Sequence, residues 1–114
     1  MTPERTRELL AQAVAKTPDY TVEDIEGFIA SGACALWTEG DSVMVTEFVI
    51  SPRLATLHVF LAAGSWKDIA LLKPKVEEWA KQQGCDMIGL TGRPGWGRLL
   101  PDYKLVTDTF VRTL

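Results

Sequence analysis

The 114-residue chain has few of the side chains that bind metal ions or form disulfides. It contains one histidine, His58, and two cysteines, Cys34 and Cys85. Each cysteine lies alone in an apolar stretch, which is typical of a buried thiol rather than of a disulfide or a metal ligand. A zinc site needs three or four such ligands close together, so we expect no metal centre.

Positive charge is not in excess either. Twelve lysines and arginines stand against fifteen aspartates and glutamates, and the two signs are interleaved along a chain of net charge −3. Proteins that bind nucleic acid carry clustered lysine and arginine for the phosphates. We therefore do not expect nucleic acid as a partner.

Long apolar runs are also missing. A membrane-spanning helix needs about 18 or more consecutive apolar residues, and no stretch approaches this length. The polar start, residues 1–5, is unlike a signal peptide. We expect no contact with a membrane and a location in the cytoplasm.

The overall composition is that of an ordinary globular protein. Hydrophobic residues make up 46% and charged residues 24% of the chain, which argues against disorder. A chain of this length buries one core but not two. We predict a single domain over residues 1–114.

Two amphipathic helices are predicted near the N-terminus. Apolar residues recur at helical spacing over residues 2–16, after which Pro18 interrupts the pattern. A second helix is predicted over residues 21–32, where Thr21 and Asp24 lie at capping-box spacing. Each helix has one apolar stripe, so we expect both to pack on one face of a sheet.

Three β-rich runs follow, at residues 34–38, 42–50 and 55–63. Turn residues at 39–41 and 51–53 separate them, which predicts antiparallel neighbours. The third run is apolar at nearly every position, which indicates burial on both of its faces.

The longest helix is predicted over residues 66–83. Ser65 and Asp68 lie at capping-box spacing at its start, and Pro74 inside it predicts a kink or a split. A strand is predicted next, at residues 85–91. A strand, a helix of this length and another strand predict a parallel crossover.

The most unusual stretch is residues 90–101, which hold three glycines, two prolines, two arginines and a tryptophan. Glycine permits positive φ and proline fixes φ. We predict a shaped corner with a short helix, packed through Trp96, before a last strand over residues 103–114. The whole order, α-α-β-β-β-α-β-α-β, predicts a three-layer α+β fold with a mixed, mostly antiparallel sheet and helices on both faces.

This order of elements resembles the GNAT superfamily of N-acetyltransferases over most of the chain. The resemblance implies a central strand that leads into the main helix and a splayed pair of parallel strands that holds acetyl-coenzyme A.

A closer resemblance covers roughly the second half of the chain. Residues 62–64, 71–80, 84–85 and the Gly-Arg-x-Gly-Trp element at 92–96 are similar to a family of small GNAT-like proteins encoded by phages and prophages. This resemblance implies a fold and a setting, in the host cytoplasm or the virion, rather than a reaction.

The coenzyme turn of GNAT enzymes resembles Gln/Arg-x-x-Gly-x-Gly/Ala, whose amides cradle a pyrophosphate at a helix N-terminus. Residues 62–68 match it poorly, with a single glycine, a bulky Trp66 and a negative Asp68 in the first helical turn. The turn is degenerate. If acetyl-coenzyme A binds, the residues expected to hold it are Gly64, Ser65, Trp66 and Lys67.

Two residues are candidates for catalysis. Glu47 lies inside a predicted strand, where glutamate faces either water or a cleft, and near the splay it could act as a general base. Tyr103 resembles the tyrosine that protonates the leaving thiolate in many GNAT enzymes. His58 could serve like Glu47 or relay through water. The plainer alternatives are an outward-facing glutamate, a packing tyrosine and a core histidine with one hydrogen bond.

The Gly-Arg-x-Gly-Trp motif supplies a further candidate binding site. Arg93 and Arg98 flank Gly95 and Trp96, and arginine binds phosphate or carboxylate through two parallel hydrogen bonds. Alternatively, the arginines pair with acidic residues of the chain itself, Glu77, Glu78 or Asp102.

Four tryptophans are many for so small a core. Trp37 and Trp66 are therefore candidates for a contact surface with a protein partner or a second copy.

Two functions follow. The first is a GNAT-fold protein with a degenerate acetyl-coenzyme A turn that serves as a non-catalytic binding, structural or assembly component of a phage-type system. The alternative is an acetyl-coenzyme A-dependent N-acetyltransferase that acts on an amine. The weak coenzyme turn favours the first.

Overall fold

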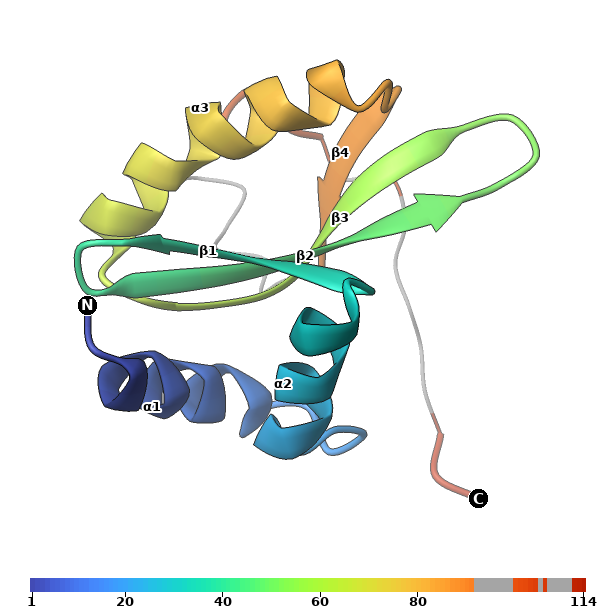
Figure 1. The fold of residues 1–114 in the computed structure, drawn as a ribbon. Helices are drawn as coiled ribbons and strands as arrows, with labels where there is room; N and C mark the ends of the chain where they lie inside the picture. The colour runs from blue at the N-terminus through green and yellow to red at the C-terminus, as the bar shows by residue number, and fades with distance from the viewer. Residues whose placement is uncertain (92–99, 105, 107–111) are drawn as a thin grey trace.

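The computed structural model describes residues 1–91, 100–104, 106 and 112–114. Within them the order of elements is α-α-β-β-β-α-β (Figure 1). The elements are α1 (Pro3–Val14), α2 (Val22–Ser31), β1 (Cys34–Glu39), β2 (Ser42–Ile50), β3 (Ala55–Gly64), α3 (Trp66–Gln82) and β4 (Met87–Leu90).

The four strands form one mixed sheet in the order β1-β2-β3-β4. β1 with β2 and β2 with β3 are antiparallel, and β3 with β4 is parallel. Figure 1 shows α1 and α2 below the sheet and α3 above it. The predicted mixed, mostly antiparallel sheet with helices on both faces is therefore confirmed.

The two N-terminal helices begin as their sequences indicate. Thr2 accepts a hydrogen bond from the backbone N–H of Arg5 and precedes Pro3. Thr21 and Asp24 form the predicted capping box, and α2 ends at Gly32 with φ of 83°.

Two apolar clusters lie on opposite faces of the sheet. One joins α1 and α2 to the lower face through residues such as Leu9, Ile25 and Val45. The other joins α3 to the upper face through residues such as Leu72 and Leu57. Both helices of the N-terminal pair share one face, as predicted.

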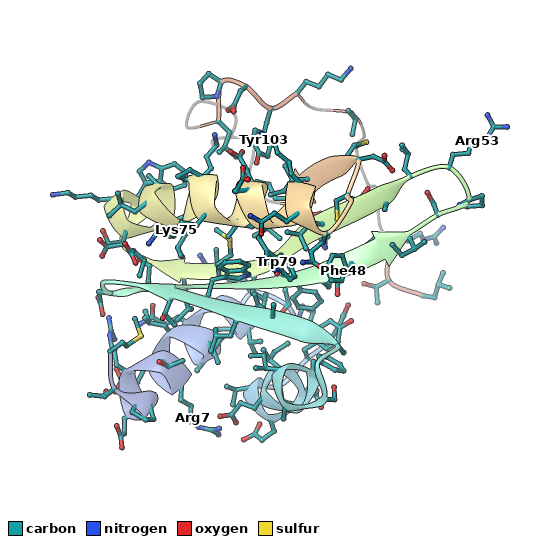
Figure 2. The ribbon with its side chains drawn as sticks, turned by 45° about the horizontal axis from the view of Figure 1, so that its top comes forward. Arg7, Phe48, Arg53, Lys75, Trp79 and Tyr103 are labelled. Carbon is teal, nitrogen blue, oxygen red and sulfur yellow. The ribbon has the colours of Figure 1, made fainter. Side chains whose placement is uncertain are left out.

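Trp37 and Trp66 are partly buried and pack against the α3 side of this core, and their role in a contact surface stays a prediction. The indole N–H of Trp37 donates to Thr46, and its ring packs edge-on against Trp79 at 5.4 Å. Trp79 also packs against Phe48 at 5.3 Å, between α3 and the sheet (Figure 2).

The start of α3 differs from the prediction. Ser65 is its N-cap, but its side chain makes no capping hydrogen bond. The carboxylate of Asp68 turns instead to the β1–β2 turn, where it accepts the backbone N–H of Asp41 at 3.0 Å. The predicted capping box is therefore wrong, because a partner distant in sequence holds Asp68.

Pro74 does not split α3, which runs without a break from Trp66 to Gln82. Pro74 lies on the exposed side, while Leu72, Val76 and Ala80 are buried against the sheet. Packing of this buried stripe on the sheet offsets the loss of one backbone hydrogen bond.

The short helix and the motif at residues 92–99 lie outside the described residues. Most of the last predicted strand does too, and the part of 103–114 that the structure describes is not in a strand. Leu100, which follows the motif, is buried.

Candidate functional site

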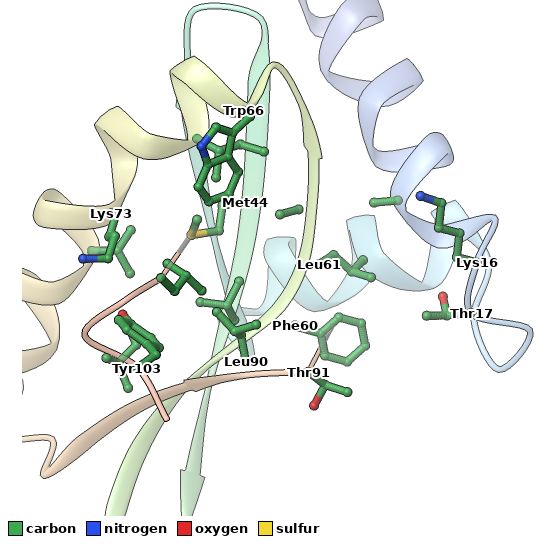
Figure 3. Close-up of a pocket in the computed structure, with 17 residues that line it drawn as sticks. Lys16, Thr17, Met44, Phe60, Leu61, Trp66, Lys73, Leu90, Thr91 and Tyr103 are labelled. Atoms are coloured by element: carbon green, nitrogen blue, oxygen red, sulfur yellow. The ribbon is translucent and has the colours of Figure 1, made fainter. Parts of the chain in front are cut away.

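The candidate site is a cleft between β3 and β4. These strands pair only where residues 56–59 of β3 meet 87–90 of β4. Over residues 60–64, β3 has no strand partner on this side within the part of the chain that the structure describes. A cavity of about 480 Å³ occupies the opening (Figure 3).

The walls of this cavity come from both layers of helices and from the sheet between them. They are mostly apolar, so the cavity suits a ligand with an apolar part. From α1 and the segment after it come Ala13, Lys16 and Thr17. From the sheet and the residue after β4 come Met44, Val59, Phe60, Leu61, Ala62, Ile88, Leu90 and Thr91. From α3 and the C-terminal part come Trp66, Ile69, Lys73, Val76, Leu100 and Tyr103.

A β-bulge shapes the cleft. Val45 of β2 pairs with Leu61, but the next residue, Thr46, pairs with Val59, so Phe60 is the extra residue of β3. A bulge bends the strand and increases its twist. The bulge follows directly after the last pair between β3 and β4, which is the point where the two strands separate.

Gly64 was predicted as a cofactor-binding residue, but the structure gives it a steric role. Its φ is +113°, and a Cβ atom there would lie 2.2 Å from the carbonyl oxygen of Asp41. At the next residue, the carbonyl oxygen of Ser65 accepts a hydrogen bond from the hydroxyl of Ser42 at 2.8 Å. Gly64 is therefore required by the β1–β2 turn that packs against it.

Asp41 is at the centre of this contact. Its carboxylate accepts two hydrogen bonds from Arg5, at 2.7 and 2.8 Å, and these hold the pKa of Asp41 below its ordinary value. Its N–H is bound by Asp68. The β1–β2 turn is thereby tied to both α1 and α3.

The remaining residues of the predicted coenzyme turn are arranged unfavourably for phosphate. The negative carboxylate of Asp68 lies in the first turn of α3, where an anion would otherwise interact with the helix dipole. The ring of Trp66 lies over the cavity near Met44 (Figure 3). Ser65 and Lys67 are exposed beside it.

Tyr103 lines the cavity as its predicted role requires, but its hydroxyl is already engaged. It donates to Glu77 at 2.7 Å, and burial, followed by this contact, raises the pKa of Tyr103 well above its ordinary value. Lys73 lies 5.4 Å from the ring centre and pairs with Glu77 at 3.3 Å and Asp102 at 3.0 Å. The phenol therefore stays protonated but gives up its proton less readily than an ordinary tyrosine.

Glu47 does not line the cavity and does not meet Tyr103 there. It lies directly opposite His58 in the β2–β3 pair. Its Oε1 atom is 3.1 Å from Nδ1 of His58, and Nε2 of His58 is 3.3 Å from the hydroxyl of Thr91. Glu47 is thus not simply an outward-facing residue, and His58 is not simply a core residue with one hydrogen bond. Each side chain is only about one quarter exposed, and the two are paired.

Thr91 is the functional candidate that sequence reasoning missed. It follows β4 directly and lines the cavity. The pairing of Glu47 with His58 could have been predicted from the sequence. A four-residue turn after Ile50 sets the register of the β2–β3 hairpin and places the two residues opposite each other. The predicted parallel pairing of β3 with β4 is confirmed, but the sequence does not specify the register that brings Thr91 to His58.

The motif residues Arg93, Gly95, Trp96 and Arg98 lie outside the described residues. Two of the acids considered as partners for the arginines already have other contacts: Glu77 binds Lys73 and Tyr103, and Asp102 binds Lys73.

Cys34 is a buried thiol, as predicted, and burial together with the charge of Glu47 raises its pKa. Among the described residues, no cluster of three or more His, Cys, Asp or Glu side chains is placed to hold a metal ion. No helix in that part of the chain is long and apolar enough to cross a bilayer.

The described residues form a small α+β fold with three helices and a four-stranded mixed sheet. No family model matches the sequence, and no significant match is found among curated proteins. Solved structures do match. TTHA1254 from Thermus thermophilus has a TM-score of 0.61 for the wild type and 0.63 for a point mutant, at 18% identity over 100% of this chain and 92% of that one.

A transcriptional regulator from Bacillus halodurans matches with a TM-score of 0.68 and 13% identity, over 100% of this chain and 96% of that one. These similarities establish the fold.

Proposed function

We propose that the protein is a GNAT-like binding component whose coenzyme turn no longer takes a pyrophosphate and whose β3–β4 cleft binds an apolar group. One observation carries this proposal: the start of α3 is closed by the contact of Gly64 and Asp68 with Asp41. The GNAT-like assignment itself rests on the order of elements and on the splay of β3 and β4.

The arrangement at the start of α3 is unfavourable for a pyrophosphate. Phosphates at helix N-termini are held by free backbone N–H groups and by the positive end of the helix dipole. Here Asp68 adds a negative charge in the first turn, and the ring of Trp66 lies beside it over the cavity. A ligand is therefore expected to bind through its apolar part.

Location in the cleft is tested with a variant that fills it. Ala62 lines the cavity, so Ala62→Phe is expected to weaken binding of S-octylpantetheine, a thioether that cannot be cleaved, at least tenfold in calorimetry. Ala70→Phe adds the same ring on the exposed side of α3 and should leave binding unchanged. Equal affinities of the two variants would place the ligand elsewhere.

An assembly role is proposed from the β2–β3 hairpin. Large apolar side chains are exposed along it and on the adjacent start of β4, and surfaces of this kind serve association. We propose a second copy of the chain as the partner. The exposed fractions are 46% for Phe48, 46% for Val49, 71% for Ile50, 43% for Leu54 and 42% for Met87. The phage or prophage setting remains a proposal that rests on the resemblance of the second half of the chain.

The alternative function, N-acetyl transfer to an amine, is favoured by the Glu47–His58 pair at 3.1 Å beside the cleft. A base held by a carboxylate can remove a proton from an attacking amine. Transfer of label from acetyl-coenzyme A to a panel of amines tests it. Turnover that is lost in both Glu47→Gln and Tyr103→Phe would support the enzyme, and no turnover would exclude it for that panel.

A further inference from the structure

Hydrogen bonds link a hydroxyl, an imidazole and a carboxylate from three neighbouring strands or strand ends. Thr91 follows β4, His58 lies on β3 and Glu47 on β2. The distances are 3.3 Å from Thr91 Oγ1 to His58 Nε2 and 3.1 Å from His58 Nδ1 to Glu47 Oε1. A nucleophile within reach of a base that a third group orients is the arrangement of nucleophilic catalysis.

The direction of the hydrogen bonds follows from the groups themselves. A carboxylate only accepts, so Nδ1 of His58 carries the proton and donates to Glu47. In a neutral imidazole Nε2 is then the acceptor, and the hydroxyl of Thr91 donates to it. Glu47 thus selects the tautomer in which His58 can take a proton from Thr91.

Of these three side chains, only that of Thr91 reaches the cavity. Thr91 lines the cavity, whereas His58 and Glu47 lie behind it and are each about one quarter exposed. Cys34, which lies across from Glu47 on β1, is not an alternative nucleophile, because it is buried and its thiol has a raised pKa.

We propose that Thr91 is a nucleophile that accepts an acyl group from an ester or thioester whose apolar part occupies the β3–β4 cavity. This activity goes beyond the proposed binding function and rests only on its claim that the cavity takes apolar groups. His58 is the general base, and Glu47 is a positioning residue.

The chemistry balances with water as the only further reactant. Oγ1 of Thr91 bonds to the acyl carbon, its proton passes to Nε2 of His58, and the bond from the acyl carbon to sulfur or oxygen breaks. The leaving thiolate or alkoxide takes the proton from His58 and departs as a thiol or alcohol. Water then attacks the threonine ester, with His58 again moving the proton, and a carboxylic acid leaves as Thr91 regains its hydrogen.

The test uses the full chain with p-nitrophenyl octanoate. Intact-mass spectrometry is expected to show one octanoyl group, mapped to Thr91 by peptide analysis, together with release of p-nitrophenol. Thr91→Val should abolish this acylation, and Thr91→Ser should restore it. His58→Gln should slow it about 100-fold or more.

Binding controls separate this activity from the cavity itself. Thr91→Val and Glu47→Gln should keep the melting temperature, and Glu47→Gln, which lies outside the cavity, should keep the affinity for S-octylpantetheine, a thioether that cannot be cleaved, while it slows acylation about tenfold or more. Acylation that persists in Thr91→Val, a label on a lysine alone, or no acylation of the unaltered protein would each overturn the proposal, even if the ligand still binds.

Discussion

At the scale of single residues, Gly64 shows how closely the start of α3 is packed. Its backbone has positive φ, and the space where a side chain would begin is filled by Asp41 and Ser42. The residue is needed for the contact between two turns.

We predict that Gly64→Ala destabilises the protein by about 3 kcal/mol, because strain at positive φ adds to an overlap with backbone atoms. Denaturation with urea measures this. Gly27→Ala is the matched control, since a Cβ atom at this α2 position meets nothing within 4 Å, and it should stabilise by about 0.5–1 kcal/mol. Equal effects at both positions would contradict the packing described for Gly64.

The two cysteines should differ in reactivity toward a thiol reagent. Cys34 is buried, and burial and the negative charge of Glu47 raise its pKa, so less of it is thiolate at a given pH. Cys85 is only partly buried. We expect Cys85 to react first, and Glu47→Gln to speed the reaction of Cys34 because it lowers the pKa of that thiol. An unchanged Cys34 rate in this variant, measured against that of Cys85, would show that access alone controls the reaction.

At the scale of elements, α3 is held by its buried stripe more than by its local sequence. Its N-cap makes no side-chain hydrogen bond, and Pro74 removes one backbone donor from its interior. Burial of Leu72, Val76 and Ala80 on the sheet is what keeps the helix continuous.

Pro74→Ala should therefore stabilise the protein by about 2 kcal/mol, since it restores a backbone donor and removes the ring from an exposed position. Urea denaturation again measures it. A loss of stability would show that α3 is adapted to proline at this site.

An element could be predicted from the sequence when local residues determine it, and could not when distant residues do. α1, α2 and the hairpins could be predicted because caps, turns and periodicity are local. The capping box at Ser65 could not be judged locally, since Asp68 has a partner 27 residues away in the chain. The same holds for Trp37 and Trp66, whose burial depends on the packing of α3.

The candidate site was predictable only in part. Tyr103 lines the cavity as expected, but its bond to Glu77 joins distant segments. Thr91 joins the site through the register of β4 on β3, and the sequence predicts their parallel pairing but not this register. Sequence alone therefore named Glu47 and His58 without showing what links them to the cavity.

At the scale of the whole molecule, the splay of β3 and β4 creates the cavity, and the exposed hairpin is the surface that we propose for association. These two features lie in different parts of the sheet, so they can be altered separately.

We predict that the protein self-associates in a concentration-dependent way and that Ile50→Lys weakens this. Ile50 is 71% exposed at the end of β2, so a charge there costs the free chain little. Leu71→Lys on α3, where leucine is 51% exposed, is the control and should leave association unchanged. Light scattering after size exclusion measures the mass, and a monomer at every concentration would contradict the assembly role.

The central claim is that the cleft takes an apolar group without recognition of the coenzyme's phosphates. Calorimetry with S-octyl-coenzyme A and S-octylpantetheine, two thioethers that share the octyl arm and cannot be cleaved, tests it most directly. We predict dissociation constants that agree within about threefold, a difference of less than about 1 kcal/mol. Tenfold or tighter binding of the coenzyme thioether, or no binding of either compound at millimolar concentration, would contradict the account.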